Sequence, residues 1–165
     1  MTQLSLFKKH ENKRVKTCAF TGHRRLNNDC SEERVKQNIR SLIEAGFELF
    51  YNGMAMGFDL LCAECVLSLK EEFPCIQLVA CLPCNGQERN YSQQDKIRYA
   101  EILKRADKCL LLSEEYYQGC MLARDRYMAD NADILMAYKR KSVGGTAYTV
   151  NYFEKHYPER DIIFL

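Results

Sequence analysis

The chain has no long apolar run, and none of its apolar segments approaches the roughly 18 residues that a membrane-spanning helix needs. It also lacks the order of a secretory leader, because its first charges follow a short apolar patch instead of preceding it. Neither an internal repeat nor a low-complexity segment is present, which argues against a solenoid or fibrous protein. We therefore expect a cytoplasmic protein that does not interact with membranes.

Net charge is also small, at +2, and it is unevenly distributed. The first 25 residues carry seven basic residues and one acidic residue, a net charge of +6, so the remaining 140 residues carry −4. A slightly acidic domain is not expected to bind duplex DNA by charge alone, because phosphate neutralisation needs several clustered cations on one face. An obvious basic groove interleaved with aromatic residues, as single strands require, is lacking too. Local anion sites remain open.

What the chain does have is the composition of one compact domain, with 47% apolar and 28% charged residues. A domain of about 150 residues buries roughly 70% of its unfolded surface, so it needs neither disulfides nor a metal. The nine cysteines are an odd number, and we expect reduced thiols. Two Cys-x-x-Cys pairs, Cys62/Cys65 and Cys81/Cys84, have zinc-ribbon spacing. Zinc and core packing both stay open, and we expect core packing without a metal.

Short apolar runs alternate with longer amphipathic stretches from Val15 onward. This alternation is typical of an α/β fold, with strand and helix units around a mostly parallel central sheet. We predict a single domain over residues 15–165, preceded by an arm over residues 1–14. The six predicted strands are 16–20, 47–51, 76–82, 108–112, 134–138 and 162–165, and the predicted helices are 31–45, 59–72, 92–105, 121–129 and 146–156.

Loops that follow parallel strands gather at one edge of the sheet, where ligands bind at the point at which the strand order reverses. After the first predicted strand come Thr21, Gly22, His23 and Arg24. Glycine allows close backbone approach, and arginine supplies forked donors for phosphate or carboxylate. A solvated basic turn is the alternative interpretation.

The loop after the second predicted strand carries Gly53, Met54 and Gly57 and opens directly into a helix at Asp59. Backbone N–H groups and the positive dipole end at a helix start form an anion site. The spacing matches neither the G-x-G-x-x-G nor the Walker pattern, and Asp59 also fits a helix N-cap.

A second glycine pair, Gly144 and Gly145, opens the helix that starts at Thr146. Between these glycine loops in the chain lie Arg124 and Arg126. Arginines on a helix are ordinarily solvated, so a functional interpretation of this pair depends on its place beside the glycine loops.

Four motifs in this order carry a resemblance to a known family: Gly22-His23-Arg24, Gly53-x-x-x-Gly57-x-Asp59, Arg124-x-Arg126 and Gly144-Gly145-Thr146. They resemble the SLOG superfamily, which contains the SMF/DprA and LOG proteins, and specifically its YpsA-like branch. The resemblance implies a Rossmann-like fold with helices on both faces of the sheet, often in a homodimer. It further implies a nucleotide-like ligand, such as NAD, ADP-ribose or a nucleoside monophosphate, and no required cofactor. The expected ligand-binding residues are Thr21, Gly22, His23, Arg24, Gly53, Met54, Gly57, Asp59, Arg124, Arg126, Gly144, Gly145 and Thr146.

LOG enzymes cut the bond between a base and ribose phosphate, with an arginine in a Met-x-x-Arg setting that Met121 to Arg124 match. They also use a glutamate, and its place here is taken by Thr149. Without that carboxylate, the group expected to stabilise oxocarbenium-like charge or to activate water is missing. The resemblance therefore favours ligand binding or sensing, and no catalytic residue is assigned. Two alternatives stay open: a DprA-like adaptor for single-stranded DNA, and a nucleotide-processing hydrolase that uses Asp125, Asp59 or His23 as its acid or base.

The arm contains the segment Gln3, Leu4, Ser5, Leu6 and Phe7. It resembles the pentapeptide by which bacterial replication and repair proteins dock on the sliding clamp of the replicative polymerase. A few apolar anchors of this kind give affinities on the order of micromolar, which suits transient recruitment. The alternative is an apolar end that packs on its own domain or extends its sheet.

Overall fold

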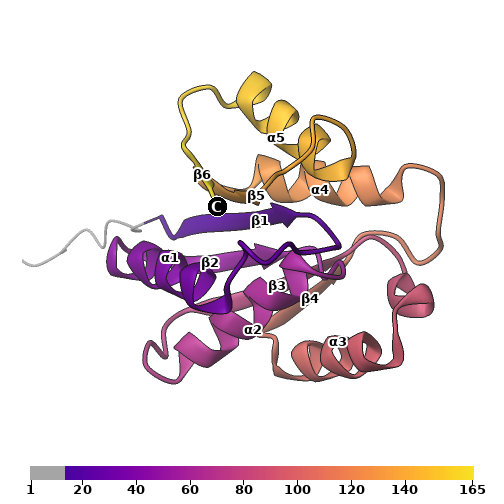
Figure 1. Cartoon of the computed structure of the whole chain (residues 1–165), viewed down its shortest axis with the longest axis horizontal. Coiled ribbons are helices and arrows are strands. Elements are labelled where there is room, and N and C mark those ends of the chain that lie inside the picture. The colour runs from indigo at the N-terminus through magenta and orange to yellow at the C-terminus, as the bar shows by residue number, and fades with distance from the viewer. Residues whose placement is uncertain (1–13) are drawn as a thin grey trace, which may run out of the picture.

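A computed structural model describes residues 14–165, which form a six-stranded sheet (Figure 1). Predictions for the arm, including Gln3 to Phe7, fall outside the described residues. The strand order is β4–β3–β2–β1–β5–β6, and each neighbouring pair is parallel. This confirms the predicted parallel sheet of six strands. The strands are β1 Lys16–Gly22, β2 Phe47–Asn52, β3 Gln77–Leu82, β4 Lys108–Leu111, β5 Ile134–Tyr138 and β6 Ile162–Phe164.

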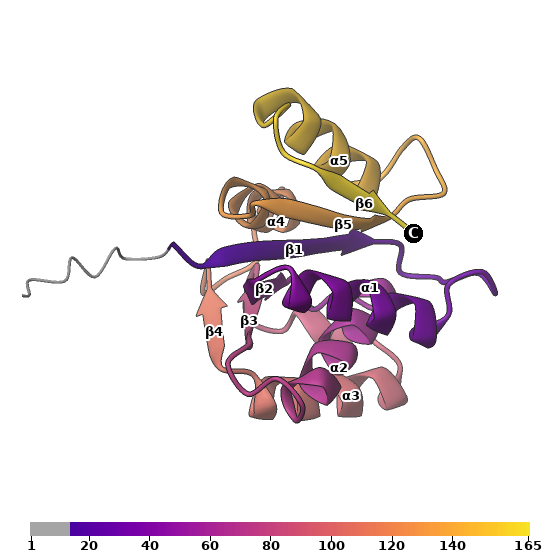
Figure 2. The ribbon, with the colours of Figure 1, turned by 90° about the vertical axis from the view of Figure 1, so that its left-hand side faces the viewer.

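Helices cover both faces of the sheet, as the Rossmann-like prediction requires. Figures 1 and 2 show α1, α2 and α3 on one face and α4 and α5 on the other. None of the helices in the described part of the chain is long and apolar enough to cross a membrane. The helices are α1 Glu32–Glu44, α2 Phe58–Lys70, α3 Gln93–Arg105, α4 Cys120–Asp130 and α5 Gly145–His156, and a short 3₁₀ turn, Gln87–Asn90, precedes α3.

The central strand β1 supplies side chains to two apolar layers. Cys18 and Phe20 belong to the layer under α1, α2 and α3, whereas Ala19 belongs to the layer under α4 and α5. All three are at most 1% exposed. Successive side chains of a strand point to opposite faces, so a strand buried on both faces is a nearly continuous apolar run. This is why the sequence identifies β1 readily.

Serine hydroxyls cap the N-termini of α1 and α3. The Oγ of Ser31 accepts a hydrogen bond from the backbone N–H of Arg34 at 3.2 Å. In α3 the Oγ of Ser92 accepts one from the N–H of Asp95 at 3.1 Å. Each serine thereby satisfies one of the backbone donors that a helix start leaves free.

The strand order reverses between β1 and β5. Strands β2, β3 and β4 follow on one side of β1, and β5 and β6 lie on its other side. At the carboxyl end of this pair, Thr21 aligns with Ala137 and Gly22 with Tyr138. Ligands of open parallel sheets bind in the crevice at such a reversal, so this edge is where a site is expected.

The two Cys-x-x-Cys pairs lie within the packed interior. All four side chains, those of Cys62, Cys65, Cys81 and Cys84, are at most 3% exposed. Burial raises the pKa of the Cys65 thiol to about 12 and that of Cys81 also to about 12, which disfavours the thiolate that binds metals. Within residues 14–165, no three His, Cys, Asp or Glu side chains are grouped so that they could hold a metal ion.

Candidate functional site

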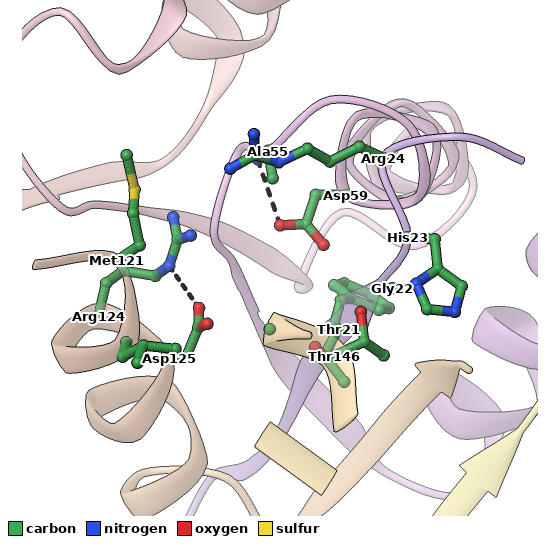
Figure 3. A pocket seen from close by; sticks show the side chains of 13 residues that line it. Thr21, Gly22, His23, Arg24, Ala55, Asp59, Met121, Arg124, Asp125 and Thr146 are labelled. Atoms are coloured by element: carbon green, nitrogen blue, oxygen red, sulfur yellow. Dashed lines mark hydrogen bonds and ion pairs between the residues drawn. The ribbon is translucent and has the colours of Figure 1, made fainter. Parts of the chain in front are cut away.

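A pocket of about 280 Å³ lies at the carboxyl end of β1, where α2, α4 and α5 begin (Figure 3). The strand reversal places it there, since the helices from both faces of the sheet start around the same crevice. Its wall consists of Phe20, Thr21, Gly22, His23, Arg24, Ala55, Asp59, Met121, Leu122, Arg124, Asp125, Gly145 and Thr146.

The three helices that start at the pocket have glycine N-caps. These are Gly57 for α2, Gly119 for α4 and Gly144 for α5, and none of the three helices has a side-chain cap. Each helix contributes residues of its first turns to the pocket wall. The positive ends of three helix dipoles therefore lie around a common space, which suits an anionic ligand, although the first N–H of α2, that of Phe58, already donates to the carbonyl of His23 at 3.1 Å. The serine caps of α1 and α3 offer no such arrangement.

The loop between β2 and α2 is fixed by the side chain of Asn52. Its Oδ1 accepts from the N–H of Met54 at 2.8 Å, and its Nδ2 donates to the carbonyl of Asp59 at 2.7 Å. Tyr91 donates its hydroxyl to the carbonyl of Met54 at 2.9 Å. Met54 itself has a φ of 61°, in the left-handed region that non-glycine residues rarely adopt. The loop thus keeps an uncommon conformation because several side chains hold it.

Arg124 anchors the same loop from α4. Its guanidinium donates to the carbonyl of Gly53, to that of Cys81 at 3.4 Å and, through Nε, to Asp125 at 2.7 Å. The residue is 4% exposed. A Cβ at Gly53 would lie 2.8 Å from the guanidinium carbon, so glycine is needed for this approach. Arg124 consequently orders the pocket wall, since most of its donors are bound to the protein.

Asp59 is the one carboxyl group buried in the pocket wall, at 6% exposure. Its Oδ2 accepts from the N–H of Ala55 at 3.2 Å, whereas its Oδ1 has no donor among residues 14–165. Figure 3 shows the carboxyl group turned to the middle of the pocket. Burial raises the pKa of Asp59 to about 7, although the charge of Arg124 acts in the opposite direction. A buried acceptor at a pocket without a protein donor is free to accept from a group in the pocket, a ligand or water.

The raised pKa of Asp59 predicts an effect of the Asp59→Asn substitution that depends on pH. The folded protein retains a proton that the unfolded chain loses above about pH 4, so stability falls as pH rises to about 7. Each pKa unit is worth about 1.4 kcal/mol, so we expect Asp59→Asn to be more stable than the wild type by up to about 4 kcal/mol at pH 8, with a higher Tm. At pH 4 the difference should vanish. Thermal denaturation at both pH values checks this, and equal stabilisation at both would contradict it.

His23 joins two loops beside the pocket. Its Nε2 accepts from the backbone N–H of Arg140 at 2.6 Å, and its ring meets Tyr138 edge-on. Burial, Lys141 and Arg140 lower the pKa of His23, which keeps the ring neutral and able to accept. Arg24 follows on the exposed rim and has no ion-pair partner within residues 14–165.

The structure gathers most of the residues expected from the sequence. Gly53, Met54, Gly57 and Gly144 support the wall without lining it. Arg126 is not brought to the pocket, because it points to α5 and donates to the hydroxyl of Tyr148 at 2.9 Å. The expected residues that line the pocket are Thr21, Gly22, His23, Arg24, Asp59, Arg124, Gly145 and Thr146.

Sequence reasoning missed several wall residues. Phe20, Ala55 and Leu122 carry no motif, and nothing local in the sequence marks them. Thr149, at the place of the LOG glutamate, is buried and donates its hydroxyl to the carbonyl of Gly145 at 2.9 Å. It does not line the pocket.

Comparisons with known proteins agree with this architecture. A UPF0398 protein of Halalkalibacterium halodurans is 30% identical over 123 residues, which are 73% of this chain and 65% of the relative. DNA processing protein A (DprA) of Streptococcus pneumoniae is 18% identical with a TM-score of 0.67, over 91% of this chain and 50% of that one. DprA of Helicobacter pylori, also 18% identical, has a TM-score of 0.65 over 90% of this chain and 64% of that one. The chain thus spans half to two thirds of the length of these relatives.

The family model described as the YspA SLOG family matches residues 18–163, from β1 to β6. The match includes every element that forms the pocket. It confirms the resemblance that the glycine motifs indicate, and the chain therefore belongs to the YpsA family of SLOG proteins.

Proposed function

We propose that the pocket binds a nucleotide or nucleotide-derived ligand, and that the protein acts as a binding or sensing protein. The observation that carries this proposal is the meeting of three helix N-termini without side-chain caps beside the buried carboxyl group of Asp59. The N–H groups suit a phosphate, and the carboxyl group suits a hydroxyl or amino donor. A nucleotide carries both kinds of group.

The start of α5 is the best place for the phosphate. Gly145 and Thr146 line the pocket there, and no atom lies within 4 Å of where a Cβ of Gly145 would be. The rim cation Arg24 adds positive charge. At about 280 Å³ the pocket is near the lower end of the range for ligand sites, about 300–1,000 Å³. This size favours a nucleoside monophosphate, or one half of NAD or ADP-ribose, over a longer polymer.

Other functions have less support from the site. A LOG-type hydrolase would need a carboxylate where Thr149 bonds to its own helix. DprA of Helicobacter pylori binds single-stranded DNA. An adaptor of that kind would need an extended surface for the strand, whereas the observations above concern one small pocket.

A charge placed at the start of α5 tests the proposal. Gly145→Asp puts a carboxylate where the phosphate would lie, and Gly145→Asn has nearly the same shape without the charge. We expect calorimetry with AMP, ADP-ribose and NAD to identify a ligand that binds the wild type. The asparagine variant should bind it within a few-fold and the aspartate variant about 10–100-fold more weakly, since like charges now meet.

Folding provides the control, because an acidic residue in the first turn of a helix is stabilising by about 0.3–1 kcal/mol. Lost binding with an unchanged or raised Tm would therefore report on the site itself. Product analysis should return the ligand unchanged if the protein only binds it. Failure of all three nucleotides to bind the wild type, or equal affinities of the two variants, would refute the proposed site.

The arm extends this proposal beyond the pocket. Gln3 to Phe7 resemble a clamp-binding pentapeptide, so the bacterial sliding clamp is the expected protein partner. The homodimer and the cytoplasmic location are likewise expectations from the resemblance and the sequence.

A further inference from the structure

Two buried side-chain oxygens in the described part of the chain lack a donor: Oδ1 of Asp59 and Oε1 of Gln87. The two oxygens lie in different parts of the structure. Gln87 lies behind the loop between β2 and α2, where its Nε2 donates to the carbonyl of Gly53 at 2.9 Å, and it does not line the pocket. Asp59 does line the pocket. Only Asp59 is therefore placed to receive a donor from a ligand there.

Several of the protein's own donors around Asp59 are bound elsewhere, and none within residues 14–165 bonds to its Oδ1. The N–H of Ala55 serves the other carboxyl oxygen, at 3.2 Å. The guanidinium of Arg124 is bound to backbone carbonyls and to Asp125, and the hydroxyl of Tyr91 is bound to a backbone carbonyl. Arg24 is exposed on the rim, where water competes for its charge. The geometry leaves the donor to be supplied from the cavity.

The charges around the cavity restrict what kind of donor this can be. Arg124 lines the wall, Arg24 lies on the rim, and three helices begin at the pocket with the positive ends of their dipoles. A cationic ligand group would be repelled by all of these. Asp125 is already paired with Arg124 at 2.7 Å and adds no free negative charge. A neutral donor, a hydroxyl or an amino group, is what remains.

Within a nucleoside 5′-monophosphate, the ribose hydroxyl groups are the donors nearest to the phosphate, and the base lies farther out. Asp59 and the start of α5 line one pocket of about 280 Å³, so the phosphate and the donor must be close together. We infer that Asp59 accepts hydrogen bonds from the ribose hydroxyl groups and thereby selects ribonucleotides over 2′-deoxyribonucleotides. This inference rests on the proposed nucleotide site.

The expected selectivity follows from the cost of leaving a buried polar group unpaired. Sites built to bond a substrate hydroxyl reject analogues without it by up to about 10⁴–10⁵-fold. A deoxyribonucleotide keeps its 3′-hydroxyl, so one of two bonds to the carboxylate is lost. The preference for AMP over 2′-deoxy-AMP should then be about 10–100-fold, and that over 2′,3′-dideoxy-AMP about 10³-fold.

Titration calorimetry of the full chain with AMP, 2′-deoxy-AMP and 2′,3′-dideoxy-AMP at pH 8 tests the inference. We expect the graded preference in the wild type. In Asp59→Ala the three affinities should lie within about threefold of one another, because the carboxylate that accepts from the ribose hydroxyl groups is gone. The matched control is Asp130→Asn on α4, outside the pocket, whose carboxylate accepts from the hydroxyl of Tyr152. It should keep the wild-type preference.

The outcomes separate the inference from the proposed function. If no nucleotide binds the wild type, both are overturned. If AMP and 2′-deoxy-AMP bind the wild type equally, the nucleotide site stands and the role of Asp59 is refuted. A preference for AMP that survives in Asp59→Ala would also refute the role of Asp59, because another residue would then bond to the ribose hydroxyl groups. Asp59→Asn keeps the shape of the side chain. It therefore distinguishes an effect of losing the carboxylate from an effect of a rearranged pocket wall.

Discussion

Replacing Arg124 with alanine is expected to lower the free energy of unfolding by about 3–5 kcal/mol, the usual cost of removing one partner of a buried ion pair. The guanidinium is 4% exposed and bonds to Asp125 at 2.7 Å. It also holds the carbonyls of Gly53 and Cys81. Without it, Asp125 and the buried Asp59 lose their nearest cation, and the carbonyl of Gly53 loses one of its donors. Urea denaturation measures the loss.

The chain offers a matched control two residues further along α4. Arg126 is only partly buried and makes one hydrogen bond, to the hydroxyl of Tyr148 at 2.9 Å. Its replacement by alanine should cost no more than about 1 kcal/mol. Arg124→Lys should recover only part of the loss, since an ammonium group lacks the planar fork that reaches several acceptors at once. Equal losses in Arg124→Ala and Arg126→Ala would show that Arg124 does not order the pocket.

Gly57→Ala is expected to destabilise the fold by about 2–5 kcal/mol, for two separate reasons. Gly57 has a φ of +76°, which costs a residue with a Cβ about 1–2 kcal/mol. That Cβ would also collide with the backbone carbonyls of His23 and Arg24, and overpacking of this kind costs about 1–3 kcal/mol. The substitution should push the β1–α1 loop away from α2 and, if the proposed site is correct, weaken nucleotide binding in the molecules that remain folded.

Gly46→Ala separates these two costs. Gly46 has a φ of +95°, but no atom lies within 4 Å of where its Cβ would be. Its replacement should cost about 1–2 kcal/mol, which is the backbone contribution alone. Thermal denaturation of both variants gives the difference. If Gly46→Ala were as destabilising as Gly57→Ala, the close packing of the two loops would contribute nothing.

Much of the fold could be predicted because the inner strands are apolar on both faces. Cys18, Ala19 and Phe20 of β1 illustrate this, since each is buried in one of the two layers. The glycine loops could be predicted for a related reason. Gly57 and Gly144 adopt positive φ values, and glycine is the residue that does so freely. Such positions therefore leave a mark in the sequence.

The pair Arg124 and Arg126 shows what the sequence could not predict. An α-helix turns through about 100° per residue, so side chains two positions apart point to nearly opposite sides. Only one of them can face the pocket, and the motif does not say which. The roles of Asp59 and Arg124 were similarly hidden. Asp59 lacks a donor, whereas the guanidinium of Arg124 is bound to carbonyls of distant elements, those of Gly53 and Cys81. Neither fact can be read from the local sequence.

The reversal of strand order has a consequence for how the protein is made. Strand β1 pairs on one side with β2, about 30 residues later, and on the other with β5, where Cys18 meets Ile134. Chains emerge from the ribosome at about 5–20 residues per second and fold from the N-terminus onward. The half with β1 to β4 can therefore assemble while one edge of β1 is still unpaired. The later pairing of β1 with β5 joins residues far apart in the sequence, and such long-range pairing slows folding. Because α4 and α5 line the pocket, the pocket is complete only after the second half has docked, so any ligand of the pocket would stabilise finished molecules and not nascent ones.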